Sequence, residues 1–403
     1  MLSVQAALER ILETAHPLPA ELVALPDALG RVLAEPVTSR RTQPPMAVSA
    51  MDGWAVRAAD IASVPTVLRQ IGTVPAGGRF DGCVEAGTCV RIFTGAPLPE
   101  GADAILIQEN ASAAADAVTA LESVPPGRHV RPAGLDFQAG EPGLPAGRAL
   151  RARDIGLAAA MNVPWLMVHR RPRVAILSTG DEIVLPGDPV GPNQIVSANG
   201  PALAALVTAC GGVPIHLGIA PDEAGALRRM AEGARGADLL VTSGGASVGD
   251  HDLVRDVLGE GGLAIDFWKI AMRPGKPLMF GRAGGVPLLG LPGNPVSAYV
   301  CALLFLRPLL LAMQGLAVGD ETVAARLGAP LPANDQRQDY LRAEVSLDGD
   351  GVPVATPFAK QDSSMMTLLA RSDGLIVRDP HAPAVSAGAT VRLLRFPAGG
   401  PAL

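Results

Sequence analysis

The sequence predicts a multidomain protein of α/β and β regions, with a parallel α/β domain at its centre. A chain of 403 residues is too long for one ordinary hydrophobic core, so several domains are expected. From residue 171 onward, apolar strand-like runs alternate with helical segments, which is typical of a parallel sheet covered by helices. The regions on either side contain short apolar runs broken by glycine and proline, which favours small β domains.

The composition narrows the class of function. With 48% hydrophobic residues, 18% charged residues and a net charge of −6, it indicates a globular protein and excludes a disordered chain or a basic nucleic-acid binder. Residues 1–15 predict an amphipathic helix and not a signal peptide. The apolar stretch 296–313 contains Arg307 and Pro308, so it predicts a buried helix and not a membrane span. We therefore expect a cytoplasmic protein with no nucleic-acid or membrane partner.

The first 170 residues predict two helices and a β region between them. Residues 3–15 place apolar side chains on one stripe, and residues 152–161 return to the same spacing. Prolines interrupt the chain between residues 22 and 57 and end any helix there. Residues 65–147 are rich in glycine and proline, with short apolar runs, and predict a small β subdomain.

The remaining chain predicts strands in two groups. Five strands are expected in the α/β region, at 174–177, 215–219, 239–242, 265–270 and 288–291. A helix at 200–210 is expected to have Asn199 as its N-cap and Gly211 as its stop signal. After residue 316, short strands are expected at 340–347, 352–356, 374–377 and 390–394.

The four cysteines do not predict a disulfide framework or a zinc site. Cys83, Cys89, Cys210 and Cys301 form no CxxC pair, and no histidine cluster lies near them in the sequence. Buried free thiols are therefore the expected state.

Polar segments follow all five predicted strands of the α/β region. These segments are 178–182, 221–223, 243–252, 273–277 and 291–295. Because ligands of open parallel sheets bind at the carboxyl ends of the strands, we expect the five segments to gather along one edge.

The chemistry of these segments is complementary. The glycines of the 243–249 loop allow backbone N–H groups to converge on an anion, and the Gly293–Pro295 turn places further N–H groups at a helix N-terminus. Arg273 and Lys276 supply positive charge. Four carboxylates supply hard oxygen ligands for Mg²⁺, namely Asp181, Glu182, Asp222 and Asp252. Together these groups predict a phosphate site with a metal ion.

Each of these features has a simpler explanation when taken alone. A glycine-rich loop is usually a turn, an aspartate after a strand is usually a helix cap, and His251 is interpreted as a surface residue. The chain lacks the Walker A pattern, GxGxxG after a strand, and HExxH. The combination at five strand ends is what favours a functional site.

The N-terminal half contains a second set of candidate residues. PMAVSAMDGWAVR, at residues 45–57, includes Asp52, and IFTGAPLPEGAD, at residues 92–103, includes the donor-rich pair Thr94–Gly95. A turn between β elements accounts for either segment equally well.

At this point the motifs resemble a known family, the molybdopterin molybdenumtransferases, whose eukaryotic relatives include the gephyrin and plant C-terminal domains. The matching motifs occur in the family's order: SAMDGWAVR, TGAPLPEGADA, RPAGLDFQAG, STGDEIV, TSGGASVGDHD, FWKIAMRPGKPLMFG and LPGNPVSA. The resemblance implies a linking domain (1–45 and 143–170), an inserted β domain (46–142), an α/β domain similar to molybdopterin adenylyltransferases (171–318) and a barrel-like C-terminal β domain (319–403).

The resemblance also implies a reaction and its partners. Adenylylated molybdopterin and molybdate are the expected substrates, the products are molybdenum cofactor and AMP, and Mg²⁺ is the expected cofactor. The family is typically a homodimer in which the second domain of one subunit approaches the α/β domain of the other. A molybdopterin adenylyltransferase is a possible docking partner.

The resemblance and the strand-end loops together define the expected site. The expected catalytic residues are Asp52, Thr94, Asp136, Glu182, Asp252 and Lys276. The expected substrate-binding residues are Ser243, Gly244, Gly245, Ser247, Gly249, Arg273, Pro292, Gly293, Asn294, Pro295, Arg342 and Ser363. Mg²⁺ is expected on Glu182, Asp222 and Asp252. The family often has lysine at the position of Arg273, and arginine is not an equivalent replacement because its guanidinium is a planar fork.

Two other functions remain open. A molybdopterin adenylyltransferase would need only the α/β domain, so the residues before 171 and after 318 argue against it. A non-enzymatic scaffold would have no need for carboxylates and cations at all five strand ends.

Overall fold

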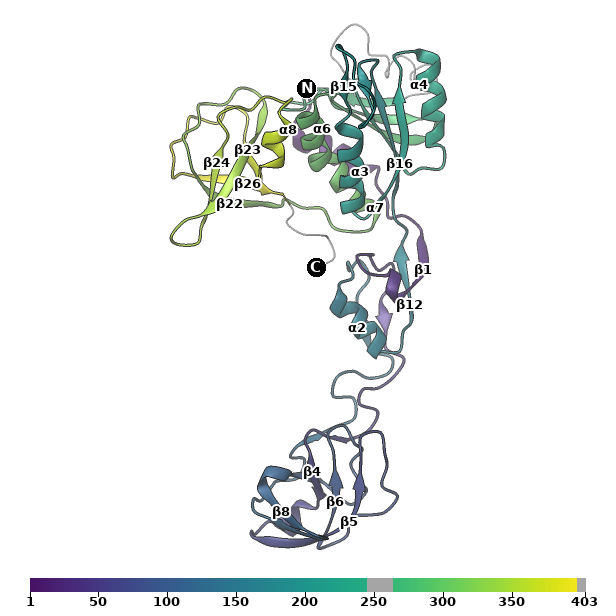
Figure 1. Ribbon diagram of the computed structural model, residues 1–403, viewed down its shortest axis with the longest axis vertical. Helices are drawn as coiled ribbons and strands as arrows, with labels where there is room; N and C mark the ends of the chain where they lie inside the picture. Colours follow the sequence, from purple (N-terminus) through teal and green to yellow (C-terminus); the bar gives the residue numbers. More distant parts are fainter. Residues whose placement is uncertain (245–263, 397–403) are drawn as a thin grey trace.

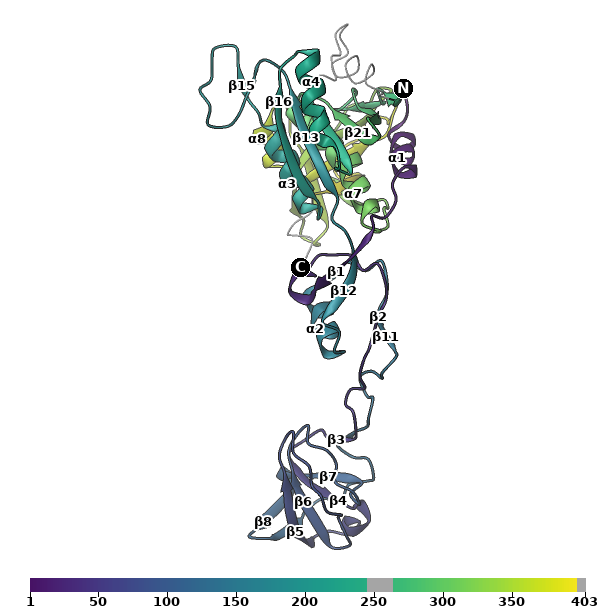
Figure 2. The ribbon, with the colours of Figure 1, turned by 90° about the vertical axis from the view of Figure 1, so that its right-hand side faces the viewer.

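The computed structural model describes residues 1–244 and 264–396. Figure 1 shows an elongated molecule with the α/β domain and the C-terminal β domain side by side at one end. The inserted β domain lies at the other end, and a small linking domain separates it from the α/β domain (Figures 1 and 2). The prediction of a multidomain protein with α/β and β regions is confirmed.

The linking domain is built from two separated stretches of chain. Strand β1 (Ala20–Ala24) pairs antiparallel with β12 (Trp165–His169), and β2 (Val37–Thr38) pairs antiparallel with β11 (Pro142–Leu144). Helix α2 (Ala152–Ala160) packs on this small core. The N-terminal helix α1 (Val4–Glu13) instead packs on the α/β domain, because its apolar stripe is buried in that domain's core.

The inserted domain is a six-stranded sheet in the order β7-β4-β6-β5-β9-β8. Its strands are β4 (Gly53–Val56), β5 (Thr66–Val74), β6 (Thr88–Ile92), β7 (Ala104–Ile107), β8 (Ala111–Ala114) and β9 (Ala117–Ala120). At its base, β3 (Val48–Ser49) pairs with β10 (Val130–Arg131), so the chain enters and leaves the domain through adjacent strands.

The α/β domain contains a six-stranded sheet in the order β16-β13-β17-β21-β20-β18. The strands are β13 (Arg173–Thr179), β16 (Val213–Ala220), β17 (Leu239–Ser243), β18 (Ala264–Trp268), β20 (Met279–Ala283) and β21 (Val286–Leu291). The helices are α3 (Asn199–Ala209), α4 (Ala224–Ala231), α6 (Pro295–Cys301) and α7 (Arg307–Met313). A separate two-stranded parallel sheet, formed by β14 (Ile183–Val184) and β15 (Ile195–Val196), lies between β13 and α3 in the sequence.

All five predicted strands of this domain are present, and one further strand completes a mixed sheet. Strands β16, β13, β17 and β21 are parallel, whereas β20 is antiparallel to both neighbours. Strand β20 joins β21 through Gly284 and Gly285, which have positive φ angles. Because β18 and β21 are both antiparallel to β20, their carboxyl ends face the same edge, as predicted for the five loops.

The long apolar helical stretch is a core element of the α/β domain. One described segment, Pro295–Met313, is long and apolar enough to cross a membrane, but 72% of it is buried inside the protein. A five-residue π-helical turn, η5 (Ala302–Leu306), joins α6 to α7. This burial agrees with the prediction of a core helix.

The C-terminal domain is a closed five-stranded barrel. Its strands are β22 (Thr322–Leu327), β23 (Gln338–Leu347), β24 (Pro353–Pro357), β25 (Gly374–Arg378) and β26 (Thr390–Arg395), and β23 pairs with β25 to close it. Helix α8 (Met366–Ala370) packs beside α6. Strand β19 (Met272–Arg273), from the α/β domain, pairs with the start of β23 and joins the two domains.

The prediction of buried free thiols is confirmed for three of the four cysteines and is wrong for Cys83. Cys89, Cys210 and Cys301 are buried, whereas Cys83 is exposed. Burial raises the pKa of the Cys89 thiol to about 12, so that thiol is inert as a nucleophile at neutral pH.

Candidate functional site

The carboxyl ends of β13, β17 and β21 meet at one edge of the sheet. Ser178 lies beside Ser243, and Ser243 lies beside Leu291 in the strand register. The side-chain amide of Asn199 joins two of these ends, because Nδ2 donates to Ser243 Oγ at 2.6 Å and to the Gly293 carbonyl oxygen at 2.8 Å. The structure therefore brings Ser243 and Gly293 together as predicted.

Asn199 has a different role from the predicted one. Helix α3 includes Asn199 itself, and its N-cap position is Ala198, which makes no side-chain capping bond. The amide of Asn199 is used between strand ends, so the prediction that it caps the helix is wrong. A polar residue between a strand and a helix fits either role, and the sequence pattern alone did not separate them.

Two glycines allow the strand ends to approach this closely. Gly244 has φ +93°, and a Cβ built there would lie 2.5 Å from the carbonyl oxygen of Thr179. A Cβ on Gly293 would lie 3.6 Å from the Cα of Gly244. The backbones after β13, β17 and β21 are therefore in direct contact, and Gly244 has to be glycine for steric reasons.

Three carboxylates gather beside these strand ends. The Asp222 N–H donates to Asp181 Oδ1 at 3.0 Å, and Glu182 follows Asp181 directly. The pKa of Asp222 is raised, first by partial loss of solvent and then by the negative charges of Asp181 and Glu182. All three residues are exposed.

The predicted magnesium site is only partly within the described structure. Within residues 1–244 and 264–396, no three His, Cys, Asp or Glu side chains are arranged so that they could hold a metal ion. Asp252 lies outside these residues, as do Gly245, Ser247, Gly249 and His251. The carboxylate oxygens of Glu182 and Asp222 are hard donors of the kind that Mg²⁺ prefers, so the residues present fit this ion chemically.

The two cations of the 273–277 turn have separate environments. Arg273 Nε donates to Asp339 Oδ1 at 2.8 Å, and a second bond from the same guanidinium makes this contact bidentate. The Nη2 atom that contacts Asp339 also donates to Asn334 Oδ1 at 3.3 Å, and Nη1 lies 3.5 Å from Asp335 Oδ2. Arg273 therefore joins the two domains, and its role as an anion ligand stays a prediction.

Lys276, in contrast, remains available. Its side chain is exposed and has no hydrogen-bond or ion-pair partner among the described residues. The preceding Gly275 has φ +111°, and a Cβ there would lie 2.4 Å from Cys301 Sγ. The turn that carries Lys276 is therefore fixed against α6.

The N-terminus of α6 differs from the predicted anion cradle. Helix α6 begins at Pro295, which has no N–H, and follows Pro292, Gly293 and Asn294. The next N–H, of Val296, donates to the carbonyl oxygen of Ser363 at 3.0 Å. A loop of the barrel thus occupies a donor that the sequence analysis left free for substrate.

Arg342 does not reach this edge with its charged group. Its side chain is 1% exposed, and its guanidinium donates to the carbonyl oxygens of Asp362 and Met365 at 2.9 Å and 3.1 Å. Its role in substrate binding stays a prediction. Ser363 lies next to the edge, where its carbonyl oxygen meets Val296.

The second predicted set comes together in the inserted domain. The carboxylate of Asp52 accepts hydrogen bonds from Thr94 N at 2.7 Å and from Thr94 Oγ1 at 2.9 Å. These bonds, the backbone one first, lower the pKa of Asp52, and the charge of Arg91 adds to the effect. Arg91 itself lies 4.6 Å above the ring of Trp54, a contact that the sequence analysis did not identify.

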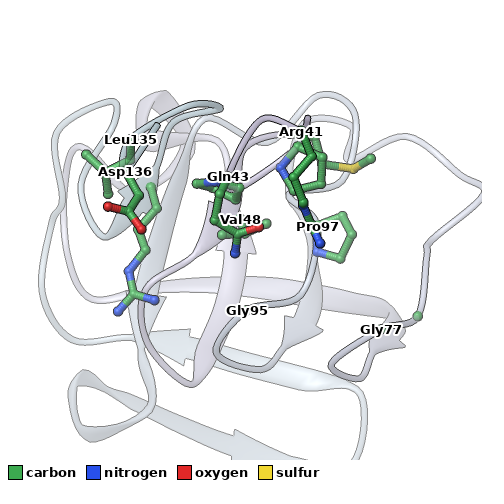
Figure 3. Close-up of a pocket in the computed structure, with 13 residues that line it drawn as sticks. Arg41, Gln43, Val48, Gly77, Gly95, Pro97, Leu135 and Asp136 are labelled. Atoms are coloured by element: carbon green, nitrogen blue, oxygen red, sulfur yellow. The ribbon is translucent and has the colours of Figure 1, made fainter. Parts of the chain in front are cut away.

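A cavity of about 500 Å³ adjoins this pair, at the junction of the linking and inserted domains. Gly95 and Asp136 are among its lining residues, and Figure 3 shows Asp136 on one side and Arg41 on the other. The Asp136 N–H donates to the Gln43 carbonyl oxygen at 3.0 Å, which joins the two crossing segments of chain. Asp52, Thr94 and Asp136 thus belong to one region.

The two sets lie far apart within one chain. The strand-end set is at the α/β end of the molecule, whereas the Asp52 set is in the inserted domain at the opposite end (Figures 1 and 2). One chain by itself does not bring the two sets together.

Comparisons with known proteins cover almost the whole chain. Three family models match in order: MoeA N-terminal region (domain I and II) at residues 2–162, Probable molybdopterin binding domain at 175–312, and MoeA C-terminal region (domain IV) at 324–396. A molybdopterin biosynthesis MoeA protein from Pyrococcus horikosii has a solved structure with a TM-score of 0.86 and 31% identity, covering 99% of this chain and 100% of that one.

Two curated relatives agree with these matches. A molybdopterin molybdenumtransferase of a Nostoc species is 37% identical over 387 residues, which is 94% of this chain and 89% of that protein. A molybdopterin molybdenumtransferase of Haemophilus influenzae is 33% identical over 401 residues, covering 98% and 99%. The matches extend over nearly the whole chain, and the chain belongs to the molybdopterin molybdenumtransferase family.

Proposed function

We propose that this chain inserts molybdate into adenylylated molybdopterin, forming molybdenum cofactor and releasing AMP. The observation that carries the proposal is the strand edge where Asn199, Ser243 and Gly293 adjoin three carboxylates, in a chain that matches the family over its whole length. Phosphate oxygens of the substrate need hydrogen-bond donors and a neutralising positive charge, and the carboxylates of this edge would hold a metal ion that supplies that charge. We place the protein in the cytoplasm.

Each group at this edge has a proposed role. The Ser243 and Gly244 backbone and the Asn199 amide shape the phosphate-binding surface. Glu182, Asp222 and Asp252 would hold Mg²⁺, which supplies charge neutralisation at the phosphoanhydride. Lys276 is the cation we assign to molybdate, because its ammonium group is exposed and has no partner within the described chain.

The proposal includes a homodimer in which Asp52, Thr94 and Asp136 of one subunit complete the site of the other. Its support is the separation of the two sets along the molecule. The linking domain also exposes large apolar side chains, with Leu22 60% and Trp165 53% exposed on paired strands. Exposed apolar surface of this kind is common at subunit interfaces.

The first experiment is a cofactor-formation assay with purified protein, adenylylated molybdopterin and low molybdate, followed by quantification of AMP. Molybdate-dependent AMP release is expected. ATP consumption with molybdopterin, and no reaction with the adenylylated form, would instead identify an adenylyltransferase. Binding without either reaction would indicate a scaffold.

The second experiment tests the shared site. Asp52→Ala and Lys276→Ala subunits are each expected to be inactive, and their mixed dimers should regain part of the activity because one site then has both intact sets. The matched control mixes Asp52→Ala with Thr94→Ala, which damage the same set and should not complement. Inactive, verified heterodimers of the first pair would exclude a site shared between subunits.

A further inference from the structure

We infer that Arg91 is a positioning residue for Asp52, because its guanidinium fixes the two chain segments that carry Asp52 and Thr94 and keeps a positive charge near the Asp52 carboxylate. The inference rests on the proposed function, in which Asp52 takes part in the reaction. Its structural part is measured without the reaction, so the two can fail separately.

Arg91 lies on a central strand of the inserted domain, directly opposite Trp54. It belongs to β6, and the strand register pairs it with Trp54 of the neighbouring β4 (Figure 2). Trp54 is 6% exposed, and its Nε1 donates to Gln70 Oε1 at 2.9 Å, so the plane of its ring is fixed. The Cζ atom of Arg91 lies 4.6 Å from the centroid of this ring and 5.0 Å from that of Phe93. Because a cation this close to an aromatic ring is attracted to its face, the two rings give the guanidinium a defined place.

The guanidinium also holds the backbone around Asp52. Its Nη1 donates to the carbonyl oxygen of Gly53, the residue after Asp52, at 3.2 Å. Its Nη2 donates to Gln108 Oε1 at 2.8 Å, and the backbone N–H of Gln108 donates to the Asp52 carbonyl oxygen at 3.1 Å. Two successive carbonyl groups are therefore fixed, that of Gly53 directly and that of Asp52 through Gln108.

The same side chain contacts the segment that carries Thr94. Phe93, whose ring lies beside the guanidinium, directly precedes Thr94 in the chain. Thr94 donates to the Asp52 carboxylate from its backbone N–H and from its hydroxyl. Arg91 thus contacts a neighbour of each member of this hydrogen-bonded pair, Gly53 on one side and Phe93 on the other. These contacts set the direction of the carboxylate through the backbone that bears it.

Positive charge is the second contribution of Arg91. Hydrogen bonds from Thr94, the backbone one first, lower the pKa of Asp52, and the charge of Arg91 lowers it further. The hydrogen-bond acceptors of Arg91 are a carbonyl oxygen and an amide oxygen, which are neutral and do not cancel this charge. The other titratable groups on the segments packed around Asp52 are Glu109, His129 and Arg131.

Two measurements on the whole protein test the inference without the reaction. Arg91→Met removes the charge and both hydrogen bonds, so exchange of the Gln108 amide hydrogen should become about two- to tenfold faster, the factor for one lost hydrogen bond. The pKa of Asp52, followed by NMR titration of its isotope-labelled carboxyl group, should rise toward the ordinary value. Arg91→Lys keeps the charge but lacks the planar guanidinium, so it should speed exchange and leave the pKa closer to its original position.

Arg69→Met is the matched control for net charge. Arg69 is an exposed arginine on β5 of the same sheet, and its removal should change neither Gln108 exchange nor the Asp52 pKa. If Arg91→Met does not fold, Arg91→Lys supplies the exchange measurement and Arg91→Gln supplies the titration. Exchange that matches the Arg69→Met control would refute the positioning contribution, and a matching Asp52 pKa would refute the charge contribution.

The pH profile of cofactor formation provides the readout in the reaction. Arg91→Met should lower kcat and move the acid limb to higher pH, because Asp52 with a raised pKa becomes protonated at a higher pH. Arg91→Lys should return the acid limb toward its original position and restore only part of kcat. Altered exchange and pKa with an unchanged activity profile would refute the link between Arg91 and the reaction. Absence of transferase activity in the unmodified protein would refute the proposed function, while exchange and titration would still decide the structural part.

Discussion

Gly244 lies directly against the carbonyl oxygen of Thr179, with no space for a side chain between them. A Cβ on Gly244 would be 2.5 Å from that oxygen, and the φ angle of Gly244 is +93°. The contact joins the ends of β13 and β17, two neighbouring parallel strands that are followed by the acidic group and the glycine-rich segment. Its geometry leads to the first prediction.

Gly244→Ala should destabilise the protein by about 1–3 kcal/mol, because an alanine there is strained and collides with backbone. It should also reduce affinity for the adenylylated substrate, since the two strand ends have to separate. Thermal unfolding and substrate titration measure the two effects. Gly236→Ala is the matched control, because Gly236 also has a positive φ but has open space around its Cβ position. Equal destabilisation by both variants would show that only backbone strain matters.

Asp222→Asn should stabilise the metal-free protein at neutral pH. The pKa of Asp222 is raised in the folded state, so folding favours its protonated form, and its ionisation opposes folding as pH rises past the ordinary carboxyl range. The variant and the unmodified protein should therefore converge in stability as pH falls below about 4. Melting temperatures between pH 3.5 and 8, measured in a chelator, provide the comparison.

A control and a metal titration complete this test. Asp81→Asn, at a side chain that is 91% exposed, should leave the melting temperature unchanged at every pH. Added Mg²⁺ should raise the melting temperature of the unmodified protein more than that of Asp222→Asn. A difference between the two proteins that does not vary with pH would contradict the assigned origin of the effect.

Arg273→Ala should destabilise the contact between the α/β domain and the barrel by about 1.5–3 kcal/mol, the range for hydrogen bonds to charged groups. The loss leaves Asp339, which is 4% exposed, without its bidentate partner. The stability of Arg273→Lys should lie between that of the unmodified protein and that of Arg273→Ala, because lysine keeps the positive charge but lacks the planar guanidinium. Arg371→Ala removes an exposed pair with Glu344 and should cost about 0–1 kcal/mol in denaturant titrations. Equal losses of stability in Arg273→Ala and Arg371→Ala would show that the contact with Asp339 contributes no more than an exposed ion pair.

Lys276→Ala should raise the molybdate concentration for half-maximal cofactor formation about 10–100-fold, the loss expected for one charge-assisted contact. The dependence on adenylylated molybdopterin should change less. The molybdate curve of the unmodified protein should also shift with salt, because exposed charges are screened over about 8–10 Å. Arg282→Ala, which removes an exposed cation elsewhere in the same domain, is the control for net charge. If only the dependence on adenylylated molybdopterin shifted, Lys276 would be assigned to binding the phosphates of that substrate and not molybdate.

Thr94→Val should move the acid limb of the activity profile to higher pH. The hydroxyl of Thr94 is one of two donors that keep the pKa of Asp52 low, so its removal lets that pKa rise toward the ordinary value. Activity that needs ionised Asp52 is then lost at a higher pH than before. Thr94→Ser keeps the hydroxyl and should keep the original profile. An unchanged acid limb in Thr94→Val would show that activity does not depend on the ionisation of Asp52.

The sequence was sufficient to predict the strand ends and insufficient to predict which side chains meet across domains. Strands such as β13 and β17 are apolar runs of ordinary length, and local pattern identifies them. Strand β20 was missed because it contains Gly281 and Arg282 and lies in a hairpin with a glycine turn. Its antiparallel direction depends on that hairpin and not on periodicity.

The arginines illustrate the second limit. Arg273 and Arg342 were expected at the substrate because family motifs and charge suggested it. Arg273 contacts Asp339 of the barrel, and Arg342, which lies in barrel strand β23, contacts Gln361 of the same domain; nothing in local spacing indicates either contact. A cation in a polar loop satisfies a ligand or a neighbouring domain equally well by sequence, and only the packing of the barrel decides between them.

The paired strands at the two ends of the inserted domain have an evolutionary and a practical consequence. Thr38 pairs with Pro142, and Val48 pairs with Arg131, so the two chain segments that lead to and from the domain run antiparallel through two successive short ladders. An ancestral hairpin at this position could have gained a whole domain at its tip with little disturbance of the parent fold, because insertions at hairpin tips are well tolerated. By the same geometry, joining residue 38 to residue 142 through a tight turn would remove the inserted domain together with Phe137, which is buried in the linking-domain core, so the shortened chain should be less stable than the whole protein.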